Sequence, residues 1–385
     1  MIEYFFWGFN FLIVYTYLIY PAILNIKAKN IKIPSLEADF EPLVSIIIPV
    51  FNEERCIKNK IESIFTSNYP LDKIEVIVYS DGSDDQTENI VLHLMNLYPQ
   101  LKFLAHQERK GKSLVVNKLV KASKFDFILL TDANIIFEKD TIRQNLKNYF
   151  DKKIGLVASL VINQMPTADN ITFQEKKYVS CENNIKYNEG LIWGCTIAPF
   201  GACFSFRKEL FVSIPENFIV DDFFIATQVL KHHHRCILEK ESVCFEELTG
   251  SIAVEFKRRK RISTGNFQNL SYFFKDFMQI FKPIGFCFWS HKGIRWVTPF
   301  LLINILIINF LIFQVNYLYQ FTLLMQLFYY CTTLTLYVTN KSNSVNNLIK
   351  FALYFLIMNA ALLIGFFHFL KGVKVGYWDV TERKL

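Results

Sequence analysis

The stretch Val44-Ser-Ile-Ile-Ile-Pro-Val-Phe-Asn-Glu-Glu54 decides the fold of this chain. Its first seven residues are apolar apart from Ser45, and a strand buried on both faces of a parallel sheet has this continuous apolar pattern. The run ends in an amide and two acids. The stretch therefore predicts a buried strand whose carboxyl end brings polar groups to one edge of a sheet, where ligands of open α/β folds bind.

Two further apolar runs repeat this pattern. Glu75–Tyr79 is followed by Asp81, and Phe127–Leu130 is followed by Asp132 and Asn134. Segments with helical patterns separate the runs, so strands alternate with helices as in βαβ units. A single acid after a strand is often a helix cap. Three in succession favour a site for a divalent cation and a nucleotide, whose partners are carboxylate and amide oxygens.

The composition places this α/β region beside a membrane. Of the 385 residues 52 % are hydrophobic, 39 are Phe, and the formal net charge is +7. The first apolar run, Tyr4–Ile23, is long enough to span a bilayer. Glu3 is the only charged residue before Lys27, so the run lacks the basic start of a secretory signal and is expected to be an uncleaved anchor. Lys27, Lys29 and Lys32 follow the run, which places the next domain in the cytoplasm. No pattern typical of nucleic-acid binding is present.

Three apolar runs close the chain, at Trp296–Tyr317, Phe321–Val338 and Phe351–Leu370. If all of them span, the basic tail lies outside, against the positive-inside tendency. Either the tail is external, or one run is re-entrant or interfacial. The Phe-rich segment Ser271–Phe281 is expected to lie in the bilayer interface.

Four motifs together resemble the inverting family 2 glycosyltransferases, which have the GT-A fold and use nucleotide sugars. The motifs are Val44–Glu54, Tyr79–Thr87, Lys110–Asn117 and Leu130–Asn134. The membrane segments on both sides resemble the subgroup that holds cellulose, hyaluronan and poly-N-acetylglucosamine synthases. The resemblance implies an α/β GT-A domain with a mixed, mainly parallel sheet, bracketed by transmembrane helices.

The resemblance assigns the first half of the domain to the donor. Asp81 and Glu53 would contact the nucleoside, Lys110 and Lys112 the diphosphate, and Asp132 with Asn134 a Mg²⁺ or Mn²⁺ ion. Asn134 stands where the family has a second acid, so the ion would have a weaker ligand there. The full set of donor residues is Pro49, Asn52, Glu53, Asp81, Lys110, Lys112, Asp132 and Arg258.

The second half would hold the acceptor. The acidic pair Asp221-Asp222 matches the place of the family's catalytic base, so Asp222 is expected to take the acceptor proton, with Asp221 as its partner. Arg261 matches the arginine of the QxxRW motif and joins them as a catalytic residue. Arg258 and Ile262 replace the Gln and Trp of that motif, and the loss of the Trp argues against processive polymerisation. The acceptor residues are Gly201, Ala202 and Gln268.

The expected division of the chain has seven parts. These are an N-terminal anchor (1–29), a linker (30–43), the nucleotide-sugar half (44–165), the acceptor and catalytic half (166–270), an interfacial segment (271–295), three membrane segments (296–370) and a basic tail (371–385).

The expected function is β-glycosidic bond formation by a multi-pass enzyme of the plasma (inner) membrane, in cell-envelope or exopolysaccharide synthesis. The donor is expected to be a UDP-sugar, a hexose or N-acetylhexosamine, and the acceptor a glycan or lipid-linked molecule, with other synthase or export subunits as further partners. Two alternatives remain open: single addition to a lipid carrier, and a non-catalytic nucleotide-sugar-binding subunit of a synthase complex.

Overall fold

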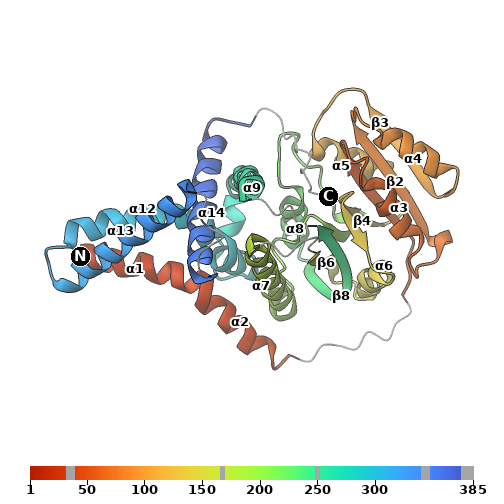
Figure 1. Ribbon diagram of the computed structural model, residues 1–385. Helices are drawn as coiled ribbons and strands as arrows, with labels where there is room; N and C mark the ends of the chain where they lie inside the picture. The colour runs from red at the N-terminus through yellow and green to blue at the C-terminus, as the bar shows by residue number, and fades with distance from the viewer. Residues whose placement is uncertain (32–39, 165–169, 248–251, 340–346, 374–385) are drawn as a thin grey trace.

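The computed structural model describes residues 1–31, 40–164, 170–247, 252–339 and 347–373. An α/β domain forms one side of the molecule and a group of long helices the other, with α7 and α9 between them (Figure 1). Pro34 of the expected linker, as well as Lys374, Arg383 and Lys384 of the expected tail, lie outside the described residues.

One sheet organises the α/β domain, with the strand order β3-β2-β1-β4-β7-β6-β8-β5. The pairs β1–β2, β2–β3, β1–β4 and β6–β8 are parallel, and β4–β7, β6–β7 and β5–β8 are antiparallel. The predicted mixed, mainly parallel sheet is confirmed. Strand β1 lies inside the sheet, which explains why every residue of it is buried.

The first half follows the predicted βαβ pattern closely. Its elements are β1 (Val44–Val50), α3 (Ile57–Phe65), β2 (Ile74–Asp81), α4 (Thr87–Met95), β3 (Leu101–His106), α5 (Lys112–Ala122), β4 (Phe127–Thr131), β5 (Ile135–Phe137) and α6 (Thr141–Leu146). The acids after β1, β2 and β4 therefore meet at one edge of the sheet, as the sequence predicts.

The second half is more regular than its sequence suggests. It contains β6 (Ile154–Gln164), α7 (Asn170–Trp193), β7 (Cys203–Arg207), α8 (Asp221–Lys231), β8 (Arg235–Glu247) and α9 (Ile252–Tyr272). Polar residues on α7 obscure its helical pattern, and they are buried by contacts that no local window reveals.

The helical part consists of α1 (Ile2–Val14), α2 (Tyr20–Ala28), α10 (Phe274–Phe277), α11 (Pro283–Cys287), α12 (Ile294–Ile312), α13 (Tyr317–Val338) and α14 (Asn347–Leu370). Three helical stretches of the described chain are long and apolar enough to cross a membrane: Ile2–Ala28, Pro283–Ile312 and Ile349–Leu370. The second begins 13 residues before the apolar run expected at Trp296. The expected run Phe321–Val338 forms most of α13 but is not among the three.

A buried ionic network joins the first two of these stretches to α7. Glu182 is 2 % exposed and accepts bonds from His291, Lys292 and Arg295. Glu189 is fully buried and accepts from the hydroxyl of Tyr20 at 2.9 Å and contacts the other ring nitrogen of His291 at 3.0 Å. Burial by itself would raise the pKa of Glu182, but its neighbours Lys292, His291 and Arg295 outweigh burial and hold this pKa well below its usual range.

The third stretch packs on α9. The hydroxyl of Ser263 donates to the carbonyl of Leu362 at 2.8 Å, and the hydroxyl of Thr264 donates to that of Gly365 at 3.1 Å. A Cβ on Gly365 would come within 2.6 Å of the carbonyl oxygen of Lys260. This glycine therefore permits the close contact between α14 and α9.

We predict that Gly365→Ala destabilises the protein by about 1–3 kcal/mol, because the added methyl group has to push the two helices apart. The measurement is thermal unfolding of the detergent-purified protein. Gly8→Ala is the matched control, since Gly8 is also helical but has nothing within 4 Å of the added carbon. Equal melting temperatures for the two variants would contradict the close packing of α14 on α9.

Candidate active site

The loops after β1 and β2 are tied to each other. The amide of Asn52 donates to Asp84 at 2.5 Å and accepts from its backbone N–H at 3.0 Å, and the backbone N–H groups of Glu53 and Glu54 donate to Thr87 and Asp85. Asn52 has a φ of +54°, a left-handed conformation that non-glycine residues rarely adopt. Asp84 and Asp85 therefore bind the neighbouring loop and hold it in place. Asp81 and Asp132 have other partners.

Asp81 anchors the loop that precedes α5. Its carboxylate is fully buried and accepts the backbone N–H of Lys110 at 2.8 Å and that of Gly111 at 2.9 Å. Gly111 has a φ of +97°, which glycine adopts without strain. Because both oxygens of Asp81 bind this loop, the carboxylate orients the start of α5 and with it Lys112.

The ammonium of Lys112 joins the two halves of the domain. It lies 2.9 Å from Asp132 at the end of β4 and 3.4 Å from Asp221 at the start of α8. Burial disfavours its charge, but the carboxylates of Asp132, Asp221 and Asp222 outweigh burial and raise the pKa of Lys112 above its usual range. Lys112 is therefore a fixed cation among three acids.

Asp222 lies beside this cation in a poorly hydrated position. Burial is the largest influence and, together with the neighbouring Asp221, raises the pKa of Asp222 to about 6, although Lys112 and Lys186 act against the rise. A carboxylate with this pKa is ionised at neutral pH and can still take up a proton, which suits a general base.

The segment Phe200-Gly-Ala202 contacts both acids. A Cβ on Gly201 would come within 3.1 Å of the Asp222 carboxylate, so glycine leaves room for this side chain. The carbonyl of Ala202 accepts the backbone N–H of Asp132 at 3.1 Å and the hydroxyl of Thr131 at 2.9 Å. The structure thus places two of the three residues expected at the acceptor, Gly201 and Ala202, between Asp132 and Asp222.

Helix α9 holds the start of α8. Gln268 donates to the carbonyl of Asn217 at 2.7 Å and accepts the N–H of Ile219 at 3.2 Å. Its neighbour Asn269 donates to the carbonyl of Val220 at 3.1 Å. The amide of Gln268, expected at the acceptor, is therefore already occupied in supporting the chain that leads to Asp221.

The other expected residues of α9 lie on its first half. Arg258 forms ion pairs with Glu246 at 3.6 Å and Glu255 at 3.9 Å. Arg261 is half-buried one turn further along the helix. The structure brings neither guanidinium into a described contact with Asp132 or Asp222, so their expected roles at the site stay predictions.

The carboxylates at this edge of the sheet suit a divalent cation whose remaining ligands are oxygens of a substrate and of water. Asp132 is 36 % exposed, and Oδ2 of Asp221 is buried without a hydrogen bond, with the ammonium of Lys112 at 3.4 Å. Among the described residues no group of three His, Cys, Asp or Glu side chains has a spacing that holds a metal. Two carboxylates suffice when phosphate and water oxygens complete the coordination, as Mg²⁺ commonly binds. Asn134 lies in the turn after Asp132, between β4 and β5.

Two buried lysines near the acids were not predicted. Lys186 of α7 is 2 % exposed, with its ammonium 3.1 Å from the centre of the Phe200 ring. Lys60 of α3 is fully buried against the ring of Phe137, and burial lowers the pKa of Lys60 to about 7. A lysine on a helix is usually solvated, so the sequence carries no local signal for either position.

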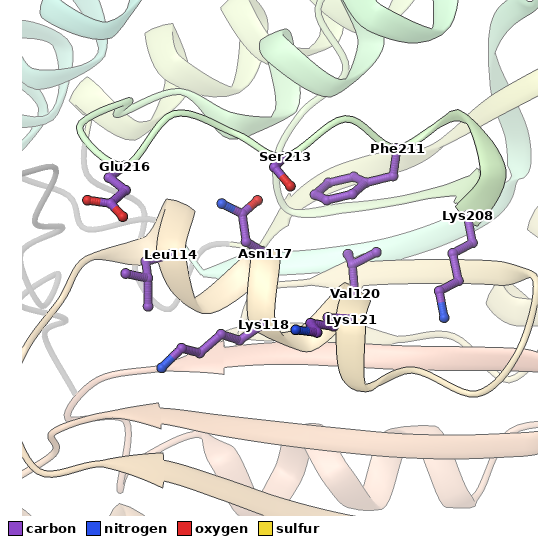
Figure 2. A pocket seen from close by; sticks show the side chains of 9 residues that line it. All are labelled: Leu114, Asn117, Lys118, Val120, Lys121, Lys208, Phe211, Ser213 and Glu216. Carbon is purple, nitrogen blue, oxygen red and sulfur yellow. The ribbon is translucent and has the colours of Figure 1, made fainter.

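A cavity of about 450 Å³ lies on another side of α5, between this helix and the segment 208–216 (Figure 2). Its lining includes Asn117, which donates to the carbonyl of Ile214 at 2.8 Å and accepts its N–H at 2.9 Å. None of the expected site residues lines this cavity. It adjoins the chain that leads to α8 rather than the acids at the sheet edge.

Comparison with known proteins agrees with this geometry. Residues 45–211 match the family model "Glycosyl transferase family 2". The chain is 23 % identical over 290 residues to the poly-beta-1,6-N-acetyl-D-glucosamine synthase of Staphylococcus aureus (strain COL), covering 71 % of this chain and 68 % of the relative. A segment of 108 residues is 29 % identical to a Methanococcus voltae dolichyl N-acetyl-alpha-D-glucosaminyl phosphate 3-beta-D-2,3-diacetamido-2,3-dideoxy-beta-D-glucuronosyltransferase, covering 28 % of this chain and 33 % of that protein.

Among solved structures, the mannosyltransferase PcManGT from Pyrobaculum calidifontis, in complex with GDP-Man and Mn²⁺, has the same fold. The TM-score is 0.70 at 20 % sequence identity, and the match covers 94 % of this chain and 99 % of that chain. Over residues 45–211 the chain is therefore similar to family 2 glycosyltransferases, and its fold is a GT-A-like α/β domain joined to membrane-length helices.

Proposed function

We propose that this enzyme transfers a sugar from a nucleotide-diphosphate donor to a hydroxyl of a glycan or lipid-linked acceptor, with inversion at the anomeric carbon. The observation that carries the proposal is the position of Lys112, between Asp132 of the donor half and Asp221 of the acceptor half. One site then holds Lys112, which can bind the phosphates of the donor, Asp132 of the donor half and the proposed base Asp222. Residues 44–165 serve the donor and residues 166–270 the acceptor.

In the proposed reaction Asp222 takes the proton of the acceptor hydroxyl while the oxygen attacks the sugar carbon C1. The bond between C1 and the diphosphate oxygen breaks, and the nucleoside diphosphate leaves with both bonding electrons. Lys112 compensates the charge that develops on this leaving group. The product is a β-glycosidic bond when the donor sugar is α-linked.

Asp132 and Asn134 would hold a Mg²⁺ or Mn²⁺ ion, with Asp221 as a further oxygen ligand nearby. When bound, such an ion neutralises phosphate charge. The Mn²⁺ in the PcManGT complex supports this assignment. We propose a UDP-sugar donor on the motifs quoted above, and the GDP-Man of PcManGT makes GDP-sugars the comparison in a donor screen.

Two acceptor classes follow from the relatives. The Staphylococcus aureus relative is named a polymer synthase, and the Methanococcus voltae relative is named for a dolichyl phosphate-linked sugar. Ile262, at the place of the family's Trp, favours single addition over processive synthesis. Product mass on a defined donor separates the two.

We further propose a membrane arrangement in which the basic tail lies in the cytoplasm, so that the tail no longer conflicts with the positive-inside tendency. In Figure 1 the axes of helices α1, α12 and α13 run roughly from left to right, whereas the axis of α14 runs roughly from top to bottom. Helices with crossed directions in one view are not parallel, so α14 does not follow the direction of the other three. This arrangement places α14, one of the three membrane-length stretches, along the membrane surface and takes α13, which is not among the three, as a crossing. With α1, α12 and α13 across the plasma membrane, the catalytic domain and the basic tail both face the cytoplasm, as the positive-inside tendency requires.

We predict that Asp222→Asn abolishes transfer and leaves nucleotide binding within about twofold, since the amide cannot accept the acceptor proton. Wild-type transfer should fall as the pH drops through about 6, because protonation removes the base. Asp276→Asn is the control, at the opposite end of α8, where Asp276 pairs with Lys231 at 3.2 Å. Transfer by Asp222→Asn at the wild-type rate would refute the assignment of the base.

We predict that Asp81→Asn weakens nucleotide binding at least tenfold. In asparagine an NH2 group replaces one of the two carboxylate oxygens. This group cannot accept the backbone N–H of Lys110 or Gly111 that it faces. One buried N–H is then left without an acceptor, at a cost of about 1–3 kcal/mol. Asp72→Asn makes the same chemical change at an exposed residue outside these loops and should bind normally. Titration of UDP and GDP against both variants measures the difference, and equal affinities would count against the anchoring role.

We predict that Leu318→Cys, at the start of α13, reacts with a membrane-impermeant maleimide in intact cells and that Lys371→Cys, just after α14, does not. The two exposed native cysteines, Cys181 and Cys331, are first changed to Ser. Labelling of both engineered sites after lysis is the control for reactivity. Labelling of Lys371→Cys in intact cells would show that α14 crosses the membrane.

A further inference from the structure

Asn117 is the last residue of the motif Lys110–Asn117, and the proposed reaction gives it no role. It lies on α5 four residues after Ser113, so the two side chains share one face of the helix. Figure 2 shows the amide of Asn117 directed from α5 toward the segment 208–216. The contacts of this face therefore indicate what the end of the motif does.

This face of α5 binds the backbone that leads to α8. The amide of Asn117 pairs with both backbone groups of Ile214, since it donates to the carbonyl at 2.8 Å and accepts the N–H at 2.9 Å. The hydroxyl of Ser113 donates to the carbonyl of Phe218 at 2.6 Å. Because Ile214 is only 2 % exposed, its backbone groups need partners within the protein, and Asn117 supplies both.

Helix α9 holds the same backbone from the other side. The amides of Gln268 and Asn269 donate to carbonyls of residues 217 and 220 at 2.7 and 3.1 Å. The ring of Phe218 packs edge-on against Phe224 of α8 and Tyr272 of α9, with ring centres 5.4 and 5.6 Å apart. Segment 214–220 is therefore held between two helices, and it ends where α8 begins.

We infer that Asn117 is a positioning residue for sugar transfer, which holds segment 214–220 on α5. By this contact it keeps the acid pair Asp221-Asp222 next to the ammonium of Lys112, which lies 3.4 Å from the first of the two acids. Lys112 is the first residue of α5, and the acid pair starts α8. One helix therefore carries both the lysine proposed to bind the phosphates and the side chain that fixes the acids beside it. The inference rests on the proposed function.

The test is the kinetics of Asn117→Ala in native membranes, which supply the acceptor, with UDP-GlcNAc and GDP-Man as donors. We expect kcat to fall at least about tenfold, since a displacement of about 1 Å at the reacting groups can cost on the order of a hundredfold. The KM for the donor and the Kd for UDP should stay within about twofold, because Lys112 and the loop bound to Asp81 remain. An unchanged kcat, or an equal loss of donor affinity, would overturn the inference.

Hydrogen exchange in detergent gives a second measurement, which needs no acceptor. In Asn117→Ala the N–H of Ile214 loses its acceptor, so the amides of residues 214–222 should exchange at least about tenfold faster, while those of β1 and β2 exchange at the wild-type rate. Wild-type exchange in residues 214–222 would also overturn the inference.

Ser113→Ala is a milder variant on the same face of α5. It removes one hydrogen bond to segment 214–220, so kcat should fall about threefold with the same donor KM. This variant keeps the inference testable if Asn117→Ala fails to fold, and a wild-type kcat in Ser113→Ala would then overturn it.

Asn148→Ala is the matched control. Asn148 is also a buried asparagine, 3 % exposed, and its amide donates to the carbonyls of Gln144 and Asn145 at 2.9 and 3.2 Å, outside segment 214–220. Its loss should lower the melting temperature in detergent and leave kcat unchanged. An equal fall of kcat in both Asn→Ala variants would reflect general instability and overturn the role of Asn117.

Asp222→Asn is measured in the same series. If it is inactive and Asn117→Ala keeps the wild-type kcat, the base assignment stands and the positioning role of Asn117 falls. If Asp222→Asn transfers sugar at the wild-type rate, the proposed function itself fails, whatever Asn117→Ala does.

Discussion

The ammonium of Lys112 is the contact on which the geometry of the site depends. It binds Asp132 at the end of a parallel strand and Asp221 at the start of a helix about ninety residues later. Without a cation, these two acids and Asp222 would repel one another. Lys112 owes its own place to the buried carboxylate of Asp81, which binds the backbone of the preceding loop. At the site the two halves are therefore joined by charge, in addition to the apolar core and the β4–β7 and β6–β8 strand pairs that they share.

Around this centre, two helices connect the site to the membrane-associated part. Helix α9 holds the start of α8 through Gln268 and Asn269, and on its other side contacts Gly365 of α14. Helix α7 is bound through Glu182 and Glu189 to helices that precede and follow the α/β domain in the chain. The positions of Asp221 and Asp222 thus depend on contacts with membrane-length helices, which fits an enzyme whose acceptor or product is handled at the bilayer.

Much of the donor half was predictable, because its signals are local. A continuous apolar run predicts a buried strand, and the acid after it lies at the carboxyl edge of the sheet whatever the distant residues are. For this reason the runs ending at Asp81 and Asp132 were correctly placed. Local reasoning did not separate acids that tie loops together, such as Asp84 and Asp85, from those that face the site, since both types follow a strand and precede a helix.

The sequence alone establishes the fold class, the donor motifs and the apolar segments, since each follows from the order of neighbouring residues. Only the tertiary structure shows which partners each charge has. Gln268, expected at the acceptor, supports the chain before Asp221, and Lys186, which looks like a solvated helix residue, is buried beside Phe200. Such pairings join residues tens to hundreds of positions apart, and their energy depends on distance and burial, which no pattern along the chain encodes.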